Sequence, residues 1–280
     1  MLSGLLMVTL AAASWGTWSL FLRPTGLPSE ATTPVIFLVM GLVTLPLALR
    51  GPRSIWDRKT VGLLLASSAF DALNVLTFFA AIETTTIAIA VLTHYVAPIL
   101  IALAAPSIDR IRTPGARPAA VVALLGLVVI LEPWREAAPG ATLGAILGLS
   151  SAVCYTGNVF AVRRLAQRIG ATRAMSYHSL IVAVVATPLL VVYGNMFSTT
   201  DLALLAVGAA TIGAGSGIAF AIGLIRIGSA RAAVLTFAEP IVAVVVGVVA
   251  WHEPLRPLAA VGGAMVLGAG IYVARKVATS

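Results

Sequence analysis

Long apolar stretches alternate with short polar connections along the whole chain. Most of these stretches approach the roughly 20 residues that a helix needs to cross a bilayer core about 30 Å thick. Uninterrupted runs of this length are typical of membrane-spanning helices rather than of soluble domains. The pattern predicts ten transmembrane helices, at Leu2–Leu22, Thr33–Leu49, Thr60–Ile82, Thr84–Ala105, Pro118–Trp134, Ala141–Val162, Arg173–Gly194, Leu202–Ile225, Ser229–Ala250 and Leu255–Val273.

The first stretch has no basic residue ahead of it and is longer than the 7 to 15 residues of a signal-peptide core, so we expect it to be a true first helix. Fifteen of the 18 Lys and Arg residues lie in alternate connections or after the tenth stretch, and only Arg23, Arg135 and Arg256 lie in the others. Because cytoplasmic loops collect Lys and Arg, this split predicts that both termini are cytoplasmic. Among the acids, Asp71 and Glu239 stand apart, since each lies near the middle of an apolar stretch.

Composition agrees with an all-α membrane protein. The 280 residues are 60% hydrophobic and 10% charged, which leaves no room for a separate soluble domain. The formal net charge of +8 is explained by orientation in a bilayer, so we expect no nucleic-acid partner. A single cysteine, Cys154, excludes an intrachain disulfide and a multi-thiolate metal site. We expect no metal or cofactor, and a monomer whose partners are the lipid bilayer and a small-molecule substrate.

The chain shows a weak internal repeat. Ser14–Arg23 can be aligned with Cys154–Arg163 at a shift of 140, and Pro98 with Pro240 at a shift of 142. The halves are residues 1–134 and 135–280, with five helices each. Because five is odd, the two halves must have opposite orientations in the membrane. Secondary transporters with such inverted repeats bind substrate near the bilayer midplane, between the halves.

Two matching segments carry polar groups and a proline in mid-stretch. Val91–Pro98 includes His94 and Tyr95, and Val234–Pro240 includes Glu239. Intramembrane polar groups are costly and usually functional. Each proline deletes a backbone hydrogen bond and is expected to kink its helix, and Pro240 would free the carbonyl of Thr236 beside Glu239. The alternative for Glu239 is an internal hydrogen bond within a kink that only shapes the bundle.

These features resemble a known family. Ser14-Trp15-Gly16, the mid-span prolines and Trp251-His252-Glu253-Pro254 are similar to the EamA branch of the drug/metabolite transporter superfamily. Within it, Phe70-Asp71 and His94–Pro98 resemble segments of bacterial aromatic-amino-acid exporters. The resemblance implies a central cavity lined mainly by helices three, four, eight and nine, with one and six contributing. The chain departs from the usual Gly-Glu before helix ten, where it has His252-Glu253, and the equivalent place in the first half carries Ile108-Asp109.

Side-chain spacing suggests which polar residues share a face. Asp71, Asn74 and Phe78 lie on one face of a helix, where Asp71 could pair with a substrate ammonium or could instead be protonated and bonded to a neighbouring helix. His94 and Tyr95 are adjacent, so at most one is expected to face the substrate. His94 could carry protons or be a hydrogen-bonded packing residue.

Aromatic residues could either line a cavity or anchor the protein at the membrane interfaces. Trp15 and Trp18 share one face, Tyr155 and Asn158 another, whereas Tyr177 and His178 are expected to be packing or interfacial residues. Pro98 and Pro240 are the predicted kinks. The complete set of predicted substrate-binding residues is Trp15, Trp18, Asp71, Asn74, Phe78, His94, Tyr95, Tyr155, Asn158, Phe220, Phe237 and Glu239.

The absence of Lys and Arg near the middle of every stretch disfavours net anionic substrates. We therefore predict a carrier of the bacterial inner membrane that exports aromatic or other apolar amino acids by alternating access. A proton-coupled exporter of lipophilic cations, using Asp71 or Glu239, is the alternative, and a passive pore is also compatible with the sequence. An intramembrane enzyme is disfavoured, because the three histidines lie on different spans or at an interface with no nucleophile or metal constellation.

Overall fold

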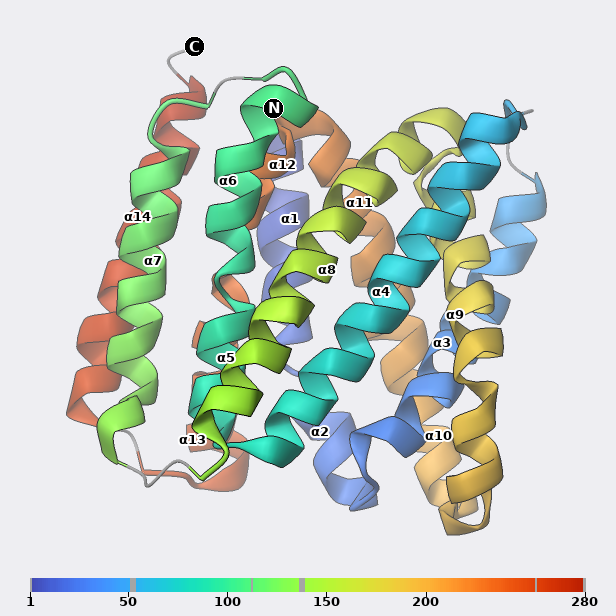
Figure 1. Cartoon of the computed structure of the whole chain (residues 1–280), viewed down its shortest axis with the longest axis horizontal. Coiled ribbons are helices and arrows are strands. Elements are labelled where there is room, and N and C mark those ends of the chain that lie inside the picture. Colours follow the sequence, from blue (N-terminus) through green and yellow to red (C-terminus); the bar gives the residue numbers. More distant parts are fainter. Residues whose placement is uncertain (1, 51–53, 112, 136–138, 255, 279–280) are drawn as a thin grey trace.

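The computed structural model is an all-helical bundle (Figure 1). It describes residues 2–50, 54–111, 113–135, 139–254 and 256–278. In this part of the chain there is no strand, and ten helical segments are long and apolar enough to cross a membrane. The predicted fold class and all ten predicted spans are confirmed, the fifth included.

Six of the ten spans are each dominated by one continuous helix, and the other four are interrupted. The continuous helices include α3 (Ser29–Arg50), α4 (Arg58–Thr84), α8 (Ala141–Ile169), α9 (Ala171–Tyr193) and α14 (Pro257–Ala278). The fifth span is α7 (Ala116–Leu131) with the short 3-10 turn η2 (Pro133–Arg135), and η3 (Gly194–Met196) follows α9. The interrupted spans are α1 (Leu2–Trp15) with α2 (Ser19–Leu22) and η1 (Arg23–Thr25); α5 (Ile87–His94) with α6 (Ala97–Ile108); α10 (Thr199–Gly208) with the π-helical η4 (Ala209–Gly215) and α11 (Ser216–Ile227); and α12 (Ser229–Leu235) with α13 (Ala238–Trp251).

The two mid-span prolines produce the predicted interruptions. Near Pro98, the amide of Val96 bonds to the carbonyl of Thr93 at 3.3 Å, and near Pro240 the amide of Phe237 bonds to that of Val234 at 3.4 Å. These are bonds to the third residue back, which tighten the helix where proline cannot donate to the fourth. Helix α6 resumes one residue before Pro98, and α13 resumes two residues before Pro240.

Connections at one end of the bundle are short and fixed by local chemistry. Asp57 caps α4 by accepting the amide hydrogen of Thr60 at 2.8 Å. Gly170 and Gly228 have φ of +85° and +81°, a region that favours glycine, and each joins two helices through a single residue. The N-terminal and C-terminal helices also begin and end here (Figure 1). We call this the basic end, defined by both termini and by the connections after Arg50, Ile108, Ile169 and Ile227.

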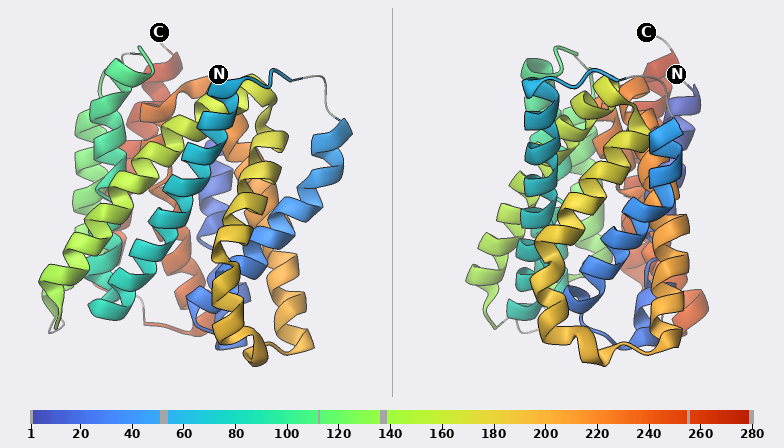
Figure 2. Two further views of the ribbon diagram at one scale, coloured as in Figure 1. Left: turned by 45° about the vertical axis from the view of Figure 1, so that its right-hand side comes forward. Right: turned by 90° about the vertical axis from the view of Figure 1, so that its right-hand side faces the viewer.

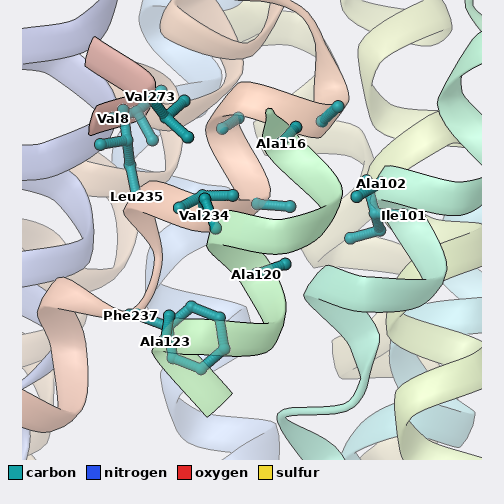
Figure 3. Close-up of a cluster of buried hydrophobic side chains, with 14 of the residues drawn as sticks. Val8, Ile101, Ala102, Ala116, Ala120, Ala123, Val234, Leu235, Phe237 and Val273 are labelled. Carbon is teal, nitrogen blue, oxygen red and sulfur yellow. The ribbon is translucent and has the colours of Figure 1, made fainter. Parts of the chain in front are cut away.

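Helix packing joins the two halves of the chain. α3 packs against α9, α7 against α14, α4 against α8 and α1 against α11, and α3 and α9 lie side by side in both views of Figure 2. A cluster of buried side chains from α1, α6, α7, α12 and α14 fills the bundle toward the basic end (Figure 3). The outer surface is apolar, with Val184 and Val191 72% and 85% exposed, as expected for helices facing lipid.

Candidate functional site

A cavity of about 430 Å³ lies between the helices. Its lining runs from Leu22 and Ser29, at the end opposite the basic end, to Val162 and Ala174 in the half of the bundle nearer the basic end. Eleven of the twelve predicted substrate-binding residues line it, and so does Pro98. Those eleven are Trp15, Trp18, Asp71, Asn74, Phe78, His94, Tyr95, Tyr155, Asn158, Phe220 and Glu239.

Phe237 is the exception. Its side chain is fully buried in the hydrophobic cluster that also includes Ala123 of α7 (Figure 3). Its ring is 5.4 Å from that of Tyr95, so it supports Tyr95 instead of forming a wall of the cavity. Of these two aromatic residues, only Tyr95 lines the cavity. Pro240 is buried and is not among the lining residues either.

Asp71 lies at the middle of α4 and holds two partners from other helices. The side-chain amide of Asn158 on α8 donates to Asp71 Oδ1 at 3.0 Å, and His178 Nε2 on α9 lies 2.9 Å from Asp71 Oδ2. His178 also lines the cavity, so the expectation that it is only a packing or interfacial residue is wrong. The rule that polar residues inside a membrane span are usually functional, which singled out Asp71, could also have identified His178.

A second polar chain connects three helices beside the first. Ser151 of α8 donates to Asn74 Oδ1 at 2.8 Å, and His94 Nδ1 lies 2.8 Å from the same hydroxyl. Because the serine hydrogen is used toward Asn74, Ser151 can only accept from His94, so Nδ1 carries a hydrogen. In the neutral ring, Nε2 is then left as an acceptor.

Aromatic rings surround His94. Its ring centroid lies 4.8 Å from that of Phe78, 5.4 Å from Tyr155 and 5.6 Å from Tyr95. His94 and Tyr95 both line the cavity, contrary to the expectation that adjacent residues must point to different faces. The chain leaves the helical path at Tyr95, so the helical spacing that separates neighbouring side chains no longer applies. On the far wall, Trp15 and Phe220 have ring centroids 5.1 Å apart.

Glu239 lies in the first turn of α13, directly after the break that follows α12, and is the second acid of the cavity. The Tyr95 hydroxyl shares a hydrogen bond with it, and Tyr155 lies within electrostatic reach of both Glu239 and Asp71. The predicted free carbonyl beside it is absent, because the Glu239 amide donates to the Thr236 carbonyl at 3.0 Å. Gly16 packs directly against the α13 backbone here, since a Cβ at Gly16 would lie 2.9 Å from the Ala243 nitrogen.

The expected set of lining helices was incomplete. The second and seventh spans, α3 and α9, also reach the cavity, through residues such as Thr33, Phe37 and Met40 on α3 and Met175 and His178 on α9. Hydropathy cannot show this, because both helices pair with each other and tilt across the bundle (Figure 2). Gly213 packs against Met40 of α3, and Gly217 packs against Met175 of α9.

The basic end is closed by a buried ion pair. Arg163 Nη1 of α8 lies 3.1 Å from Asp109 Oδ1, and their side chains are 9% and 1% exposed. Arg163 Nε also donates to the Leu224 carbonyl at 3.2 Å, and the Ser229 amide donates to Asp109 Oδ2 at 3.1 Å. Four helices from both halves are thereby tied together at this end.

Comparison with known proteins agrees with this architecture. The sequence model of the EamA-like transporter family matches residues 2–131 and 142–275. The chain belongs to the EamA-like transporter family. The resemblance seen in the sequence is therefore confirmed at the level of the family, which does not single out the amino-acid exporters within it.

This EamA-like protein is also similar to two individual proteins. An uncharacterized transporter of Archaeoglobus fulgidus is 30% identical over 271 residues, which cover 95% of this chain and 94% of the relative. A protein of known crystal structure is 23% identical and superimposes with a TM-score of 0.81, over 97% of this chain and 96% of the other. The second likeness shows the fold alone. Family and relative together indicate a multi-pass membrane transporter rather than an enzyme.

Proposed function

We propose that this EamA-like protein is a secondary transporter that exports aromatic or other apolar amino acids from the cytoplasm by alternating access. The observation that carries the proposal is the composition of the cavity. Its lining combines two carboxylates, Asp71 and Glu239, with aromatic rings in tilted and edge-on contact, and includes no Lys or Arg among the described residues. Intramembrane acids of this kind mark substrate or ion pathways.

The cavity chemistry suits a zwitterion with a flat apolar side chain. A substrate ammonium has carboxylates to pair with, and a substrate carboxylate has amide and hydroxyl donors such as those of Asn74 and Tyr95 within the same lining. Trp15 and Phe220 offer ring faces for stacking. The volume of about 430 Å³ lies within the range of pockets that hold small organic ligands.

We propose that the chain is built from two inverted halves, residues 1–134 and 135–280. The family matches two stretches of the chain, one in each half. The second span packs on the seventh, and the fifth packs on the tenth. In an inverted repeat the members of each pair are equivalent, because superimposing one half on the other places the second span on the seventh and the fifth on the tenth. Such a pseudo-symmetric bundle supports alternating access, because each half can adopt the arrangement of the other.

In this structure the cavity reaches the end opposite the basic end, whereas the Arg163–Asp109 pair closes the basic end. With the basic end in the cytoplasm, this state faces outward. The corresponding location is the plasma membrane, the inner membrane in a bacterium. A substrate released from such a state would leave the cell.

The same acids and rings would also suit a lipophilic cation, so that candidate needs a direct test. Purified protein in proteoliposomes should take up labelled L-phenylalanine with saturable, exchange-stimulated kinetics. Uptake of a lipophilic cation in place of amino acids would favour the alternative, and flux that never saturates would indicate a passive pore.

Trp15→Ala should raise the KM for L-phenylalanine about tenfold, because it removes a cavity-lining ring on which the aromatic side chain of the substrate would stack, a contact of about 1–1.5 kcal/mol. Trp56→Ala is the matched control, since Trp56 is 48% exposed and packs on Tyr177 outside the cavity. Equal effects of the two substitutions on KM would contradict the assigned site. The absence of any amino-acid or amine flux in wild-type protein would overturn the proposed function.

A further inference from the structure

The cluster around Asp71 contains two polar atoms whose hydrogen-bonding capacity is unused. His178 Nδ1 and Asn158 Oδ1 are buried and have no hydrogen-bond partner among the described residues. Both residues line the cavity, where the Asp71 side chain remains 15% exposed. A buried polar atom without a partner is uncommon and calls for an explanation.

The partners of Asp71 determine what these two atoms can do. An ionised carboxylate can only accept, so His178 Nε2 carries the hydrogen that points to Asp71 Oδ2 at 2.9 Å. The neutral ring therefore has its bare lone pair at Nδ1. A second proton would add there, and Asp71 would stabilise the resulting imidazolium as an ion pair.

The other charged or titratable groups of the cavity come from other elements. Glu239 of α13 has Tyr95 as its hydrogen-bond partner, and His94 of α5 has Ser151. Tyr155 of α8 lies near both acids, and α3 presents the Phe37 ring 6.2 Å from the His178 ring. Asp71 is thus the acid of this cavity that has an imidazole in direct contact.

We infer that His178 is the proton site of the transporter, and that a proton on His178 and a substrate ammonium at Asp71 exclude each other. One carboxylate would otherwise face two cations about 6 Å apart. At an effective dielectric constant of about 20, that repulsion weakens binding about 100-fold. Substrate loading would then release a proton, which is the exchange that a proton antiporter requires. This inference rests on the proposed function and adds the coupling ion to it.

The test measures protons released on binding. Purified protein in weak buffer near pH 6.5 is mixed with L-phenylalanine or with phenylethylamine, which has the ammonium but no carboxylate. Wild-type protein should release up to one proton for each ligand bound. His178→Gln keeps an N–H donor for Asp71 but cannot be protonated, so it should bind without releasing a proton.

His94→Gln is the matched control, because His94 is the other histidine of the cavity and contacts Ser151 instead of an acid. Its proton release per bound ligand should equal that of wild type, whatever its affinity. Release that persists in His178→Gln, or that disappears only in His94→Gln, would overturn the inference. So would wild-type binding with no proton release, which would leave the proposed function standing.

A second measurement needs no variant and holds even if His178→Gln does not fold. The affinity of wild-type protein for phenylethylamine should be about 10- to 100-fold weaker at pH 5.5 than at pH 8, because the proton competes at low pH. An affinity that is unchanged or tighter at the acid pH contradicts the inference. Failure of wild-type protein to bind either ligand or to carry any amino acid is a different result, which concerns the proposed function.

Discussion

Residues in the cavity differ mainly in how completely their polar atoms are satisfied. Asn74 and His94 are both hydrogen-bonded to the Ser151 hydroxyl, which fixes the orientation of their side chains. Asp71 instead holds partners that each retain an unused atom. Because unused buried atoms cost free energy, we expect rearrangement on ligand binding to centre on Asp71, His178 and Asn158.

The sequence indicated residue types more reliably than residue orientations. The cost of polar groups in a bilayer was enough to single out Asp71, Glu239 and His94. It could not separate Tyr95, which faces the cavity, from Phe237, which lies behind it. That difference depends on how two broken helices turn, and a helical wheel assumes an unbroken one.

Gly16 gives a test of local packing. A Cβ there would lie 2.8 Å from Val242 Cβ and 2.9 Å from the Ala243 nitrogen, so Gly16→Ala must separate the turn after α1 from α13. We expect a loss of about 1–3 kcal/mol of stability, as in other overpacked cores, together with slower transport. Thermal unfolding in detergent measures the first and proteoliposome flux the second.

Gly62→Ala is the control for that substitution. A Cβ at Gly62 would have open space around it, and the residue lies within α4. Alanine there should be neutral or stabilising by up to about 1 kcal/mol, because glycine is a poor helix former. If Gly16→Ala were equally harmless, close packing of α1 on α13 would not be what this glycine provides.

At the scale of elements, two ion pairs lie at opposite ends of the bundle. Arg23 Nη1 lies 2.6 Å from Glu253 Oε1, with both side chains about half exposed, whereas Arg163 and Asp109 are buried. In the proposed repeat, Arg23 corresponds to Arg163 and Glu253 corresponds to Asp109. The buried pair lies at the closed end and the exposed pair at the end that the cavity reaches. Alternation between inward- and outward-facing states would require the Arg163–Asp109 pair to become exposed and the Arg23–Glu253 pair to become buried.

Asp109→Asn should therefore favour opening of the basic end. Removing one charge of a buried pair leaves Arg163 uncompensated, at a cost of about 3 kcal/mol to the closed state, or roughly a hundredfold in its population. A cysteine at Ala174, which lines the cavity toward the basic end, reports the change through faster modification from the basic end. The background for this experiment is Cys154→Ser.

Asp57→Asn is the matched control, since Asp57 also pairs with an arginine of α8, Arg168, at the same end. Hydrogen bonds from the Thr60 amide and hydroxyl, with Arg168 nearby, hold the pKa of Asp57 below its usual range. Any stability from this lowered pKa is lost as pH falls through the folded-state value, but the exposed group is screened by water. Cysteine modification at Ala174 should be unchanged in Asp57→Asn, and an equal acceleration would argue against a specific gate at Asp109.

For the whole molecule, hydropathy determines the number of spans, whereas helix packing determines which spans line the cavity. Ten spans followed from segment length and from the alternation of basic connections, because the bilayer imposes both. The participation of α3 and α9 in the cavity did not follow, since it depends on how the two helices cross each other and reach inward. Asp109 and Arg163 were counted as loop charges, yet they are among the least exposed charged groups described.

The orientation of the whole molecule can be tested by labelling single cysteines in intact cells. In a Cys154→Ser background, Asn195→Cys lies in η3 at the end opposite the basic end, and Lys59→Cys lies at the start of α4, at the basic end. Both sites are exposed. If cytoplasmic loops hold the basic residues, a membrane-impermeant maleimide should label Asn195→Cys in intact cells and Lys59→Cys only after permeabilisation. The reverse pattern would place the basic end outside, and the cavity in this structure would then open toward the cytoplasm as an uptake state. Because that result would reverse the proposed direction of transport without changing the cavity, the labelling experiment separates the direction of transport from the identity of the substrate.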